Sequence, residues 1–246
     1  MNGREGAPVN GSEALIRELA RDLDPVQPIP RIRTVMSGVI ALWLGVAAIG
    51  FTVLGLRPDL ARAMLGVGGV AVVFAGLGMA GLGGVAAALA MGVPGREGLA
   101  RASLALAILG MLIAAGVGSL LFALSPVAEA RVSWTGDLAC LVVAVLVGLL
   151  PAIGVVWFAG RASPFRPVIA VLAAAAGAVA LGAITAGASC THSEMRHLLV
   201  AHALAPAFGV LLLTLPLLVA LKRFRRSSQG LDSSSSPSLG DSEPRP

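Results

Sequence analysis

The chain contains two cysteines, Cys140 and Cys190, and each lies beside the end of a long apolar run. Cys140 follows the start of the run 138–160, and Cys190 comes directly after the run 167–189. If both runs cross a membrane, the two thiols lie at one depth on helices that are neighbours in sequence. A Cα separation of about 5–6 Å, which a disulfide needs, is then feasible. The alternative is two buried, unpaired thiols that act as small apolar side chains.

Histidines close to Cys190 introduce a second kind of chemistry, metal binding. Four residues offer the sulfur and nitrogen ligands of a zinc site: Cys140, Cys190, His192 and His197. Their spacing is poor for one, because the chain has no Cys-x-x-Cys or His-x-x-x-His pair. His197 and His202 are five residues apart, about 140° around an α-helix, so we do not expect them to bind one ion together. We therefore predict no metal, keep those four residues as the weaker alternative, and expect His202 to be a hydrogen-bonded interfacial residue.

The composition is that of a membrane protein. Hydrophobic residues make up 57% of the 246 residues and charged residues only 13%, whereas soluble domains carry about a quarter charged residues. No charge occurs in 63–95 or in 102–128, and apolar runs of about 18 or more residues predict membrane-spanning helices. The net charge of +5 comes from basic residues at span ends and does not indicate nucleic-acid binding. We find no Ser/His/Asp arrangement, no phosphate-binding loop and no carboxylate pair in a plausible cleft, and expect neither an enzyme nor a cofactor.

The predicted fold is all-α, with six transmembrane helices in a compact bundle. The expected spans are 35–56, 63–91, 102–124, 138–160, 167–189 and 197–221. Residues 1–34 form a cytoplasmic segment, and 222–246, rich in Ser, form a disordered tail. Ten basic residues near span ends lie on the side of the termini: Arg31, Arg33, Arg96, Arg101, Arg161, Arg166, Lys222, Arg223, Arg225 and Arg226. Four lie on the other side: Arg57, Arg62, Arg131 and Arg196. The excess predicts cytoplasmic termini, with the cysteines on the oxidising face of a bacterial inner membrane.

Small residues recur along two spans and predict close helix packing. The first face consists of Gly76, Ala80 and Gly84, and the second of Ala170, Ala174, Ala178, Gly182 and Ala186. We expect both faces to pack inside the bundle, with a homodimer interface as the alternative. No Asp, Glu, Lys or Arg falls in the interior of any predicted span, which argues against a proton-coupled pump or a charged substrate.

The segment 12–30 has the pattern of a binding element. Ser12 is a suitable N-cap for a helix over 12–24. One narrow apolar stripe follows at helical spacing, formed by Leu15, Ile16, Leu19 and Leu23, and the prolines Pro25, Pro28 and Pro30 end the helix. A helix of about three turns is marginal alone in water, so the stripe needs a surface to cover it. The alternative is a helix that lies on the membrane or on its own bundle.

These features together resemble a known family. The residue pairs Leu15-Ile16, Leu19-Ala20, Asp22-Leu23 and Pro25-Val26 precede six spans, with one outward Cys at span four and another after span five, in Cys190-Thr-His. The pattern resembles the NrsF-like family of multi-pass "negative regulator of sigma F" proteins over roughly 15–221. Members are membrane anti-sigma factors that hold an extracytoplasmic-function sigma factor at the inner membrane.

The resemblance implies roles for particular residues. Seven residues would bind the sigma factor: Leu15, Ile16, Leu19, Asp22, Leu23, Pro25 and Val26. Cys140 and Cys190 would form a redox-sensitive pair, and periplasmic redox or metal stress would release the sigma factor. The implied partners are the sigma factor and the lipid bilayer, without direct contact to nucleic acid. Two other classes fit the composition: a small transporter or exporter of a neutral solute, and a structural membrane subunit.

Overall fold

The computed structural model describes residues 11–21, 31–65, 69–124, 134–162, 164–192 and 194–233. The chain divides into two compact units, residues 1–30 and residues 31–246. The described residues contain helices and no strand, and six of the helices are long and apolar enough to cross a membrane. The prediction of an all-α protein with six spans is therefore confirmed. The boundary between the two units lies four residues before the predicted one at residue 34.

The first unit contributes one described helix, α1 (Gly11–Arg21). It begins one residue before the predicted cap, Ser12, with Glu13 in its first turn and Arg21 in its last. This placement of charge complements the helix dipole. Residues 22–24, the predicted end of the helix, and the proline-rich connector lie outside the described residues.

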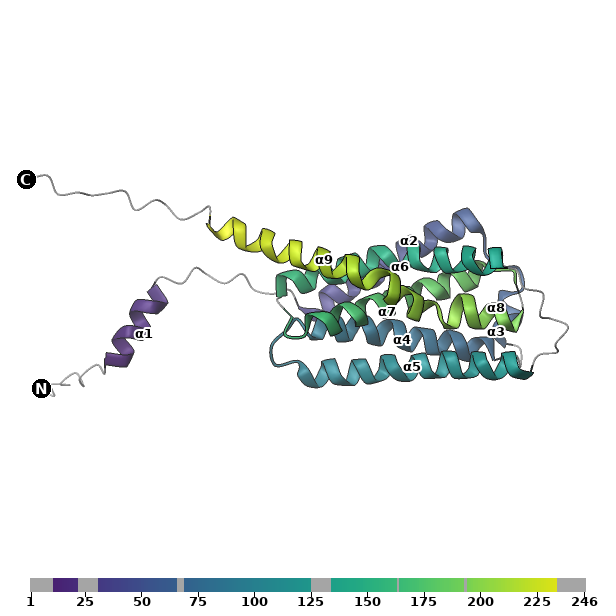
Figure 1. Ribbon diagram of the computed structural model, residues 1–246, viewed down its shortest axis with the longest axis horizontal. Coiled ribbons are helices and arrows are strands. Elements are labelled where there is room, and N and C mark those ends of the chain that lie inside the picture. The colour runs from purple at the N-terminus through teal and green to yellow at the C-terminus, as the bar shows by residue number, and fades with distance from the viewer. Residues whose placement is uncertain are drawn as a thin grey trace, which may run out of the picture. The chain divides into compact units, whose positions relative to one another are not determined.

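The second unit is a bundle whose helices run along a common direction (Figure 1). The first five spans are α2 (Ile32–Leu54), α4 (Val70–Ala90), α5 (Glu97–Leu124), α6 (Trp134–Ala162) and α7 (Pro167–Ser189). The last span combines α8 (Met195–His197), the π-helix η2 (Leu198–Ala203) and α9 (Ala205–Ser233). A short helix, α3 (Leu60–Leu65), precedes α4, so the predicted span 63–91 is a short helix followed by one crossing.

The C-terminal boundary differs from the prediction. Helix α9 continues to Ser233, so 222–233 are helical and not the start of a disordered tail. Lys222 and the residues after it end the apolar run, but Lys and Arg are good helix formers and do not end a helix. Residues 234–246 lie outside the described residues.

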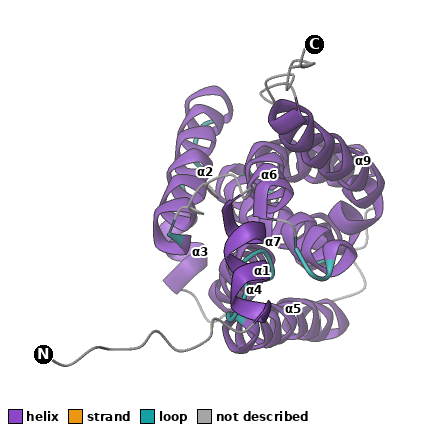
Figure 2. Ribbon diagram, turned by 90° about the vertical axis from the view of Figure 1, so that its left-hand side faces the viewer, coloured by secondary structure: helices purple, strands orange, loops and turns teal. Residues whose placement is uncertain are grey.

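Helix α7 forms the centre of the bundle. Of the 18 most apolar consecutive residues of α7, 72% are buried, whereas the corresponding share is 56% in α4, 17% in α5 and 11% in α2. It packs on α4, α6 and α9, and Figure 2, which looks along the bundle, shows α2 and α5 at the edge. Helix α7 is therefore covered by neighbours on several sides, whereas α2 is covered on few.

Small residues make this close packing feasible, as predicted. Gly76, Ala80 and Gly84 are buried, as are all five members of the predicted face on α7. A Cβ added at Gly84 would lie 2.6 Å from the Ala173 carbonyl oxygen and 2.8 Å from the Gly177 Cα. The two backbones therefore meet without side chains between them. Both faces are used inside one chain, which leaves neither free for the alternative role in a homodimer.

Replacing Gly84 by valine is expected to destabilise the bundle. The new side chain meets backbone atoms of α7, which cannot rotate away, and overpacking costs typically about 1–3 kcal/mol. Thermal unfolding in detergent, followed by circular dichroism, measures the effect. Gly45→Val on α2 is the matched control, because a Cβ at Gly45 meets nothing within 4 Å. Equal melting temperatures for the two variants would contradict the close approach of α4 and α7.

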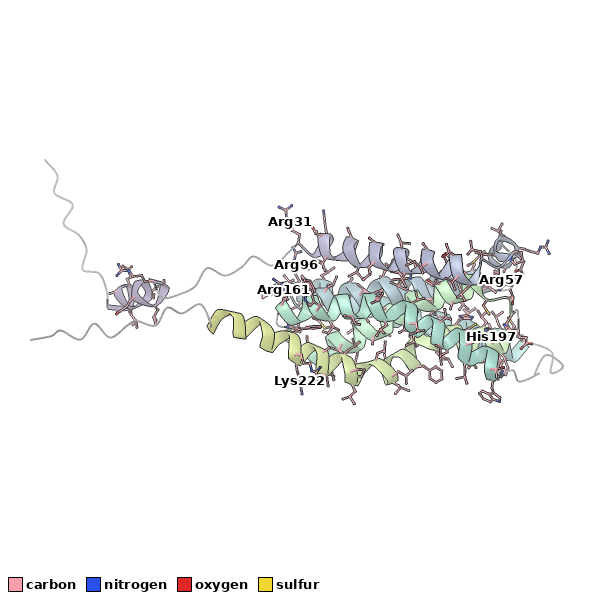
Figure 3. The ribbon with its side chains drawn as sticks, turned by 90° about the horizontal axis from the view of Figure 1, so that it is seen from above. Arg31, Arg57, Arg96, Arg161, His197 and Lys222 are labelled. Carbon is pink, nitrogen blue, oxygen red and sulfur yellow. The ribbon has the colours of Figure 1, made fainter. Side chains whose placement is uncertain are left out.

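The two ends of the bundle differ in their polar residues. Figure 3 places Arg31, Arg96, Arg161 and Lys222 at one end, and Arg57 and His197 at the other. Arg31 directly precedes α2 and Lys222 lies in α9, so the start of α2 and this part of α9 lie at the first end (Figure 3). We call it the basic end and the opposite one the thiol end.

A candidate thiol–imidazole site at one end of the bundle

Three spans bring cysteine and histidine side chains together at the thiol end. Cys140 lies in the second turn of α6, Cys190 follows the last residue of α7, His197 ends α8, and His202 lies in η2. We call these four residues the thiol–imidazole cluster. One ligand atom from each lies within 4.8 Å of every other. Cys190, His197 and His202 are buried, and Cys140 is partly buried.

The two cysteines are in direct contact. Their Sγ atoms lie 3.4 Å apart, and both thiols are free. The sequence-based prediction that neighbouring spans bring them to one depth agrees with this geometry. In a disulfide the sulfurs would be about 2.05 Å apart, so bond formation needs a further approach of about 1.3 Å.

A buried carboxylate and imidazole support Cys190. His197 Nε2 lies 3.1 Å from Cys190 Sγ, and His197 Nδ1 lies 2.7 Å from Asp137 Oδ1. The Asp137 carboxylate accepts the Nδ1–H bond and thereby fixes the orientation of the ring. This Asp–His–Cys order is the order of a base-activated nucleophile, which the sequence analysis did not find. Hydrogen bonds, first from the Cys140 thiol and then from His197 and His202, hold the pKa of Cys190 below its usual range.

Asp137 is a site residue that the sequence analysis did not single out, because it lies one position before the predicted span 138–160. It lies in the first turn of α6 with only 4% of its surface exposed. Its Oδ2 lies 2.8 Å from the Arg196 guanidinium, within ion-pair distance, although the angle is outside that of a hydrogen bond. Arg196 also lies 4.9 Å from the centre of the Trp134 ring. The spacing of Asp137 and Cys140, three residues apart and so on one helix face, is the signal that could have revealed it.

A π-helical turn places His197 beside His202. Leu204 N donates to Leu199 O, an i→i+5 bond of 2.9 Å, and η2 extends over 198–203. In such a turn, the i→i+5 hydrogen bonds bring residues five apart to one face of the helix, unlike those of an α-helix. The two rings are 5.2 Å apart and edge-to-face. The expectation that His197 and His202 do not bind one ion together assumed α-helical geometry, and that assumption is wrong for 198–203.

His192 occupies a different position from the one predicted. Its side chain is exposed, its Nδ1 is 3.7 Å from Cys190 Sγ, and its ring stacks on His197 at 4.9 Å. Among the described residues, the set whose ligand atoms share one small volume contains His202 in place of His192. This set differs in one member from the weaker alternative of Cys140, Cys190, His192 and His197.

A cleft opens next to the cluster at the thiol end. Its volume is about 260 Å³, and Cys190, His192 and His202 form part of its lining. Arg57 also lines the cleft and donates two hydrogen bonds to Asp59, of 2.8 and 2.7 Å. These bonds lower the pKa of the Asp59 carboxyl, and its carboxylate balances the positive charge that Arg57 keeps. Small molecules and ions therefore have a route to Cys190 and His202.

The second group of predicted site residues lies on α1. Leu15, Ile16 and Leu19 are 56%, 63% and 62% exposed and follow one face of the helix. The other predicted sigma-factor contacts, Asp22, Leu23, Pro25 and Val26, lie outside the described residues. The described part of the stripe is thus an exposed apolar surface on one face of α1.

The fold and the cluster define a class: a six-span helical membrane protein with a buried thiol–imidazole site at one end. A family model described as "NrsF: Negative regulator of sigma F" matches residues 19–225, which is most of the chain, and the chain belongs to this family. Membership in this family identifies the chain as a negative regulator of a sigma factor. Comparisons with curated proteins and with solved structures give no significant match.

Proposed function

We propose that this protein is an anti-sigma factor that holds an extracytoplasmic-function sigma factor at the bacterial inner membrane and releases it on a periplasmic signal. The observation that carries the proposal is the exposed stripe of α1 in a chain of this family. The role is regulatory and requires no catalysis. The sigma factor would be unavailable to RNA polymerase for as long as α1 covers its apolar surface.

The stripe has the features of a helix that docks in a groove. Leu15, Ile16 and Leu19 recur at helical spacing on one side, which is the pattern of helix-in-groove recognition. Burying one such side chain contributes about 1.5–3 kcal/mol. Three of them can therefore supply most of the free energy of a micromolar complex, which is about −8 kcal/mol.

The orientation of the bundle would separate binding from sensing. Counted along the sequence, the excess of Lys and Arg near span ends favours a cytoplasmic basic end, and the thiol end is then periplasmic. The segment with α1 precedes α2 at the basic end, so it would be cytoplasmic together with the sigma factor. Cysteines at the opposite end would face the oxidising compartment.

Oxidation of the cysteine pair is the proposed signal. The Cys190 thiolate attacks a peroxide, which breaks the O–O bond, releases water or an alcohol after proton uptake, and leaves a sulfenic acid. The Cys140 thiol then condenses with it, which forms the S–S bond and releases water. The sulfurs must approach each other by about 1.3 Å, and this draws the start of α6 towards the end of α7.

A hydrogen bond connects α7 to the span that follows the binding segment. The Trp43 indole N–H on α2 donates to Leu181 O at 3.1 Å and to Thr185 Oγ1 at 3.3 Å. Helix α2 is the least buried of the six spans, so few other contacts connect it to the bundle. A movement of α7 would therefore reach α2 through Trp43.

Replacing Trp43 by phenylalanine is expected to weaken the response to oxidation without loss of sigma-factor binding. The variant keeps an aromatic ring but loses the donor, worth about 1 kcal/mol, or about fivefold in an equilibrium. The measurement is the ratio of sigma-dependent transcription with and without diamide. Trp157→Phe, at an exposed position of α6, is the control. An unchanged ratio for Trp43→Phe would remove Trp43 from the transmission route.

The proposal is tested by fractionation of cells that contain the full chain and a tagged extracytoplasmic-function sigma factor from the same genome. We expect the sigma factor in the membrane fraction, and in the soluble fraction when residues 1–30 are deleted. Because 31–246 form a compact unit of their own, the shortened chain should still insert. A sigma factor that stays soluble with the full chain, for every such factor of the genome, would overturn the proposal.

A further inference from the structure

We infer that Cys140, Cys190, His197 and His202 form a binding site for one thiophilic divalent cation of the Zn²⁺ class. This inference concerns the metal site alone and does not depend on sigma-factor binding. Two thiolates and two imidazoles are the ligands of an S₂N₂ site, which selects Zn²⁺ and related ions over Mg²⁺ or Ca²⁺. Two thiolates also cancel the charge of the cation, so the loaded site is neutral within the bundle.

The distances fit tetrahedral coordination. With Zn–S bonds of about 2.3 Å and Zn–N bonds of about 2.0–2.1 Å, a tetrahedron sets the ligand atoms about 3.3–3.8 Å apart. The sulfurs are 3.4 Å apart, Cys190 Sγ is 3.1 Å from His197 Nε2, and all four ligand atoms lie within 4.8 Å of one another. A cation at the centre therefore requires shifts of only about 1 Å.

Asp137 completes the surroundings of the first imidazole. It accepts the Nδ1–H bond of His197 at 2.7 Å, which leaves Nε2 directed at Cys190 and at the proposed ion. A carboxylate behind a histidine ligand fixes its tautomer and increases its basicity, an arrangement common at zinc sites. Arg196, 2.8 Å from the other carboxylate oxygen, holds Asp137 in place.

His202 is buried with one ring nitrogen available to a ligand. It is 2% exposed, and its Nδ1 meets no hydrogen-bond partner in the part of the chain that the structure describes. The wide turn of η2, an uncommon helical form often found at functional sites, is what brings it to His197. An ordinary α-helical turn would place it about 140° away from His197. The cleft lined by Cys190 and His202 provides the entry path that a metal site requires.

Metal titration of the purified, reduced full chain in detergent tests the inference, with Co²⁺ as a spectroscopic probe and Zn²⁺ as competitor. We expect one equivalent of Co²⁺ to give sulfur-to-metal charge transfer and the visible bands of tetrahedral Co²⁺, both removed by Zn²⁺. Cys190→Ser and His202→Gln should each weaken binding at least about 100-fold, since even loss of an outer partner costs 10–100-fold. Asp137→Asn should weaken it about 10–100-fold.

His192→Gln is the matched control, because His192 is a neighbouring but exposed histidine outside the set. It should bind Co²⁺ as the unchanged chain does. Circular dichroism and size-exclusion profiles identify variants that fail to fold, and Cys140→His, which keeps four ligands, should retain tetrahedral bands with weaker charge transfer. Absence of one-equivalent binding to the folded chain, or loss in His192→Gln with none in His202→Gln, would overturn the inference.

Discussion

A chain with Leu15→Glu and Leu19→Glu is expected to lose its sigma factor and to give sigma-dependent transcription at the level of a deletion strain. Both side chains are more than half exposed on one face of α1, and docking would bury them. Losing two apolar contacts costs at least about 3 kcal/mol, more than about 100-fold in Kd. Burying two carboxylates in an apolar groove adds to this cost. The measurement is co-purification of the sigma factor with the full chain, together with a transcriptional reporter.

Ala14→Glu is the control for this pair. Ala14 is exposed and lies about 100° from Leu15 and about 140° from Leu19 around the helix, so Ala14→Glu adds one of the two negative charges to the same helix away from the centre of the stripe. We expect normal retention of the sigma factor in this variant. Two outcomes would contradict the assignment of the stripe: retention in the double variant, or equal release in the control.

The spans could be predicted from the sequence because a segment's own residues decide whether it forms a helix in the bilayer. A run without charge, such as 102–124, must form a helix in lipid to satisfy its backbone, whatever its neighbours do. The same reasoning does not place helix ends in water. At Lys222 the cost of a charge in lipid ends the crossing, but the backbone hydrogen bonds continue along α9 to Ser233.

Half of the thiol–imidazole cluster could also be predicted. Cys140 and Cys190 occupy matching ends of consecutive antiparallel spans, and topology alone brings them to one level. The position of His202 could not be predicted, because it depends on one extra residue in the turn between Leu199 and Leu204. Packing selects that wide turn, and apolar periodicity does not reveal it. The role of Asp137 could not be predicted for a related reason. A charged residue beside a span is expected to lie in a loop unless its buried partners are known.

Changing either cysteine to serine is expected to abolish the transcriptional response to peroxide or diamide, and the two variants should differ chemically. The chain has no other cysteine, so every thiol measurement reports on this pair. In Cys140→Ser, Cys190 keeps the hydrogen bond of His197 and still forms a sulfenic acid, which has no thiol with which to condense. It should therefore persist and react with dimedone, as detected by mass spectrometry. In Cys190→Ser, Cys140 has lost the activated partner and should be labelled far more slowly.

This asymmetry separates a redox pair from two thiols that only fill space. If the cysteines served packing alone, serine at either position would alter stability, and the one remaining thiol would be labelled by dimedone equally slowly in both variants. His192→Gln provides the control, because it changes the exposed imidazole near Cys190 and leaves the contact between the two sulfurs intact. A preserved response in both serine variants would refute the sensor. Faster labelling of Cys140 than of Cys190 would instead reverse their roles, because His197 would then not be the group that activates the attacking sulfur.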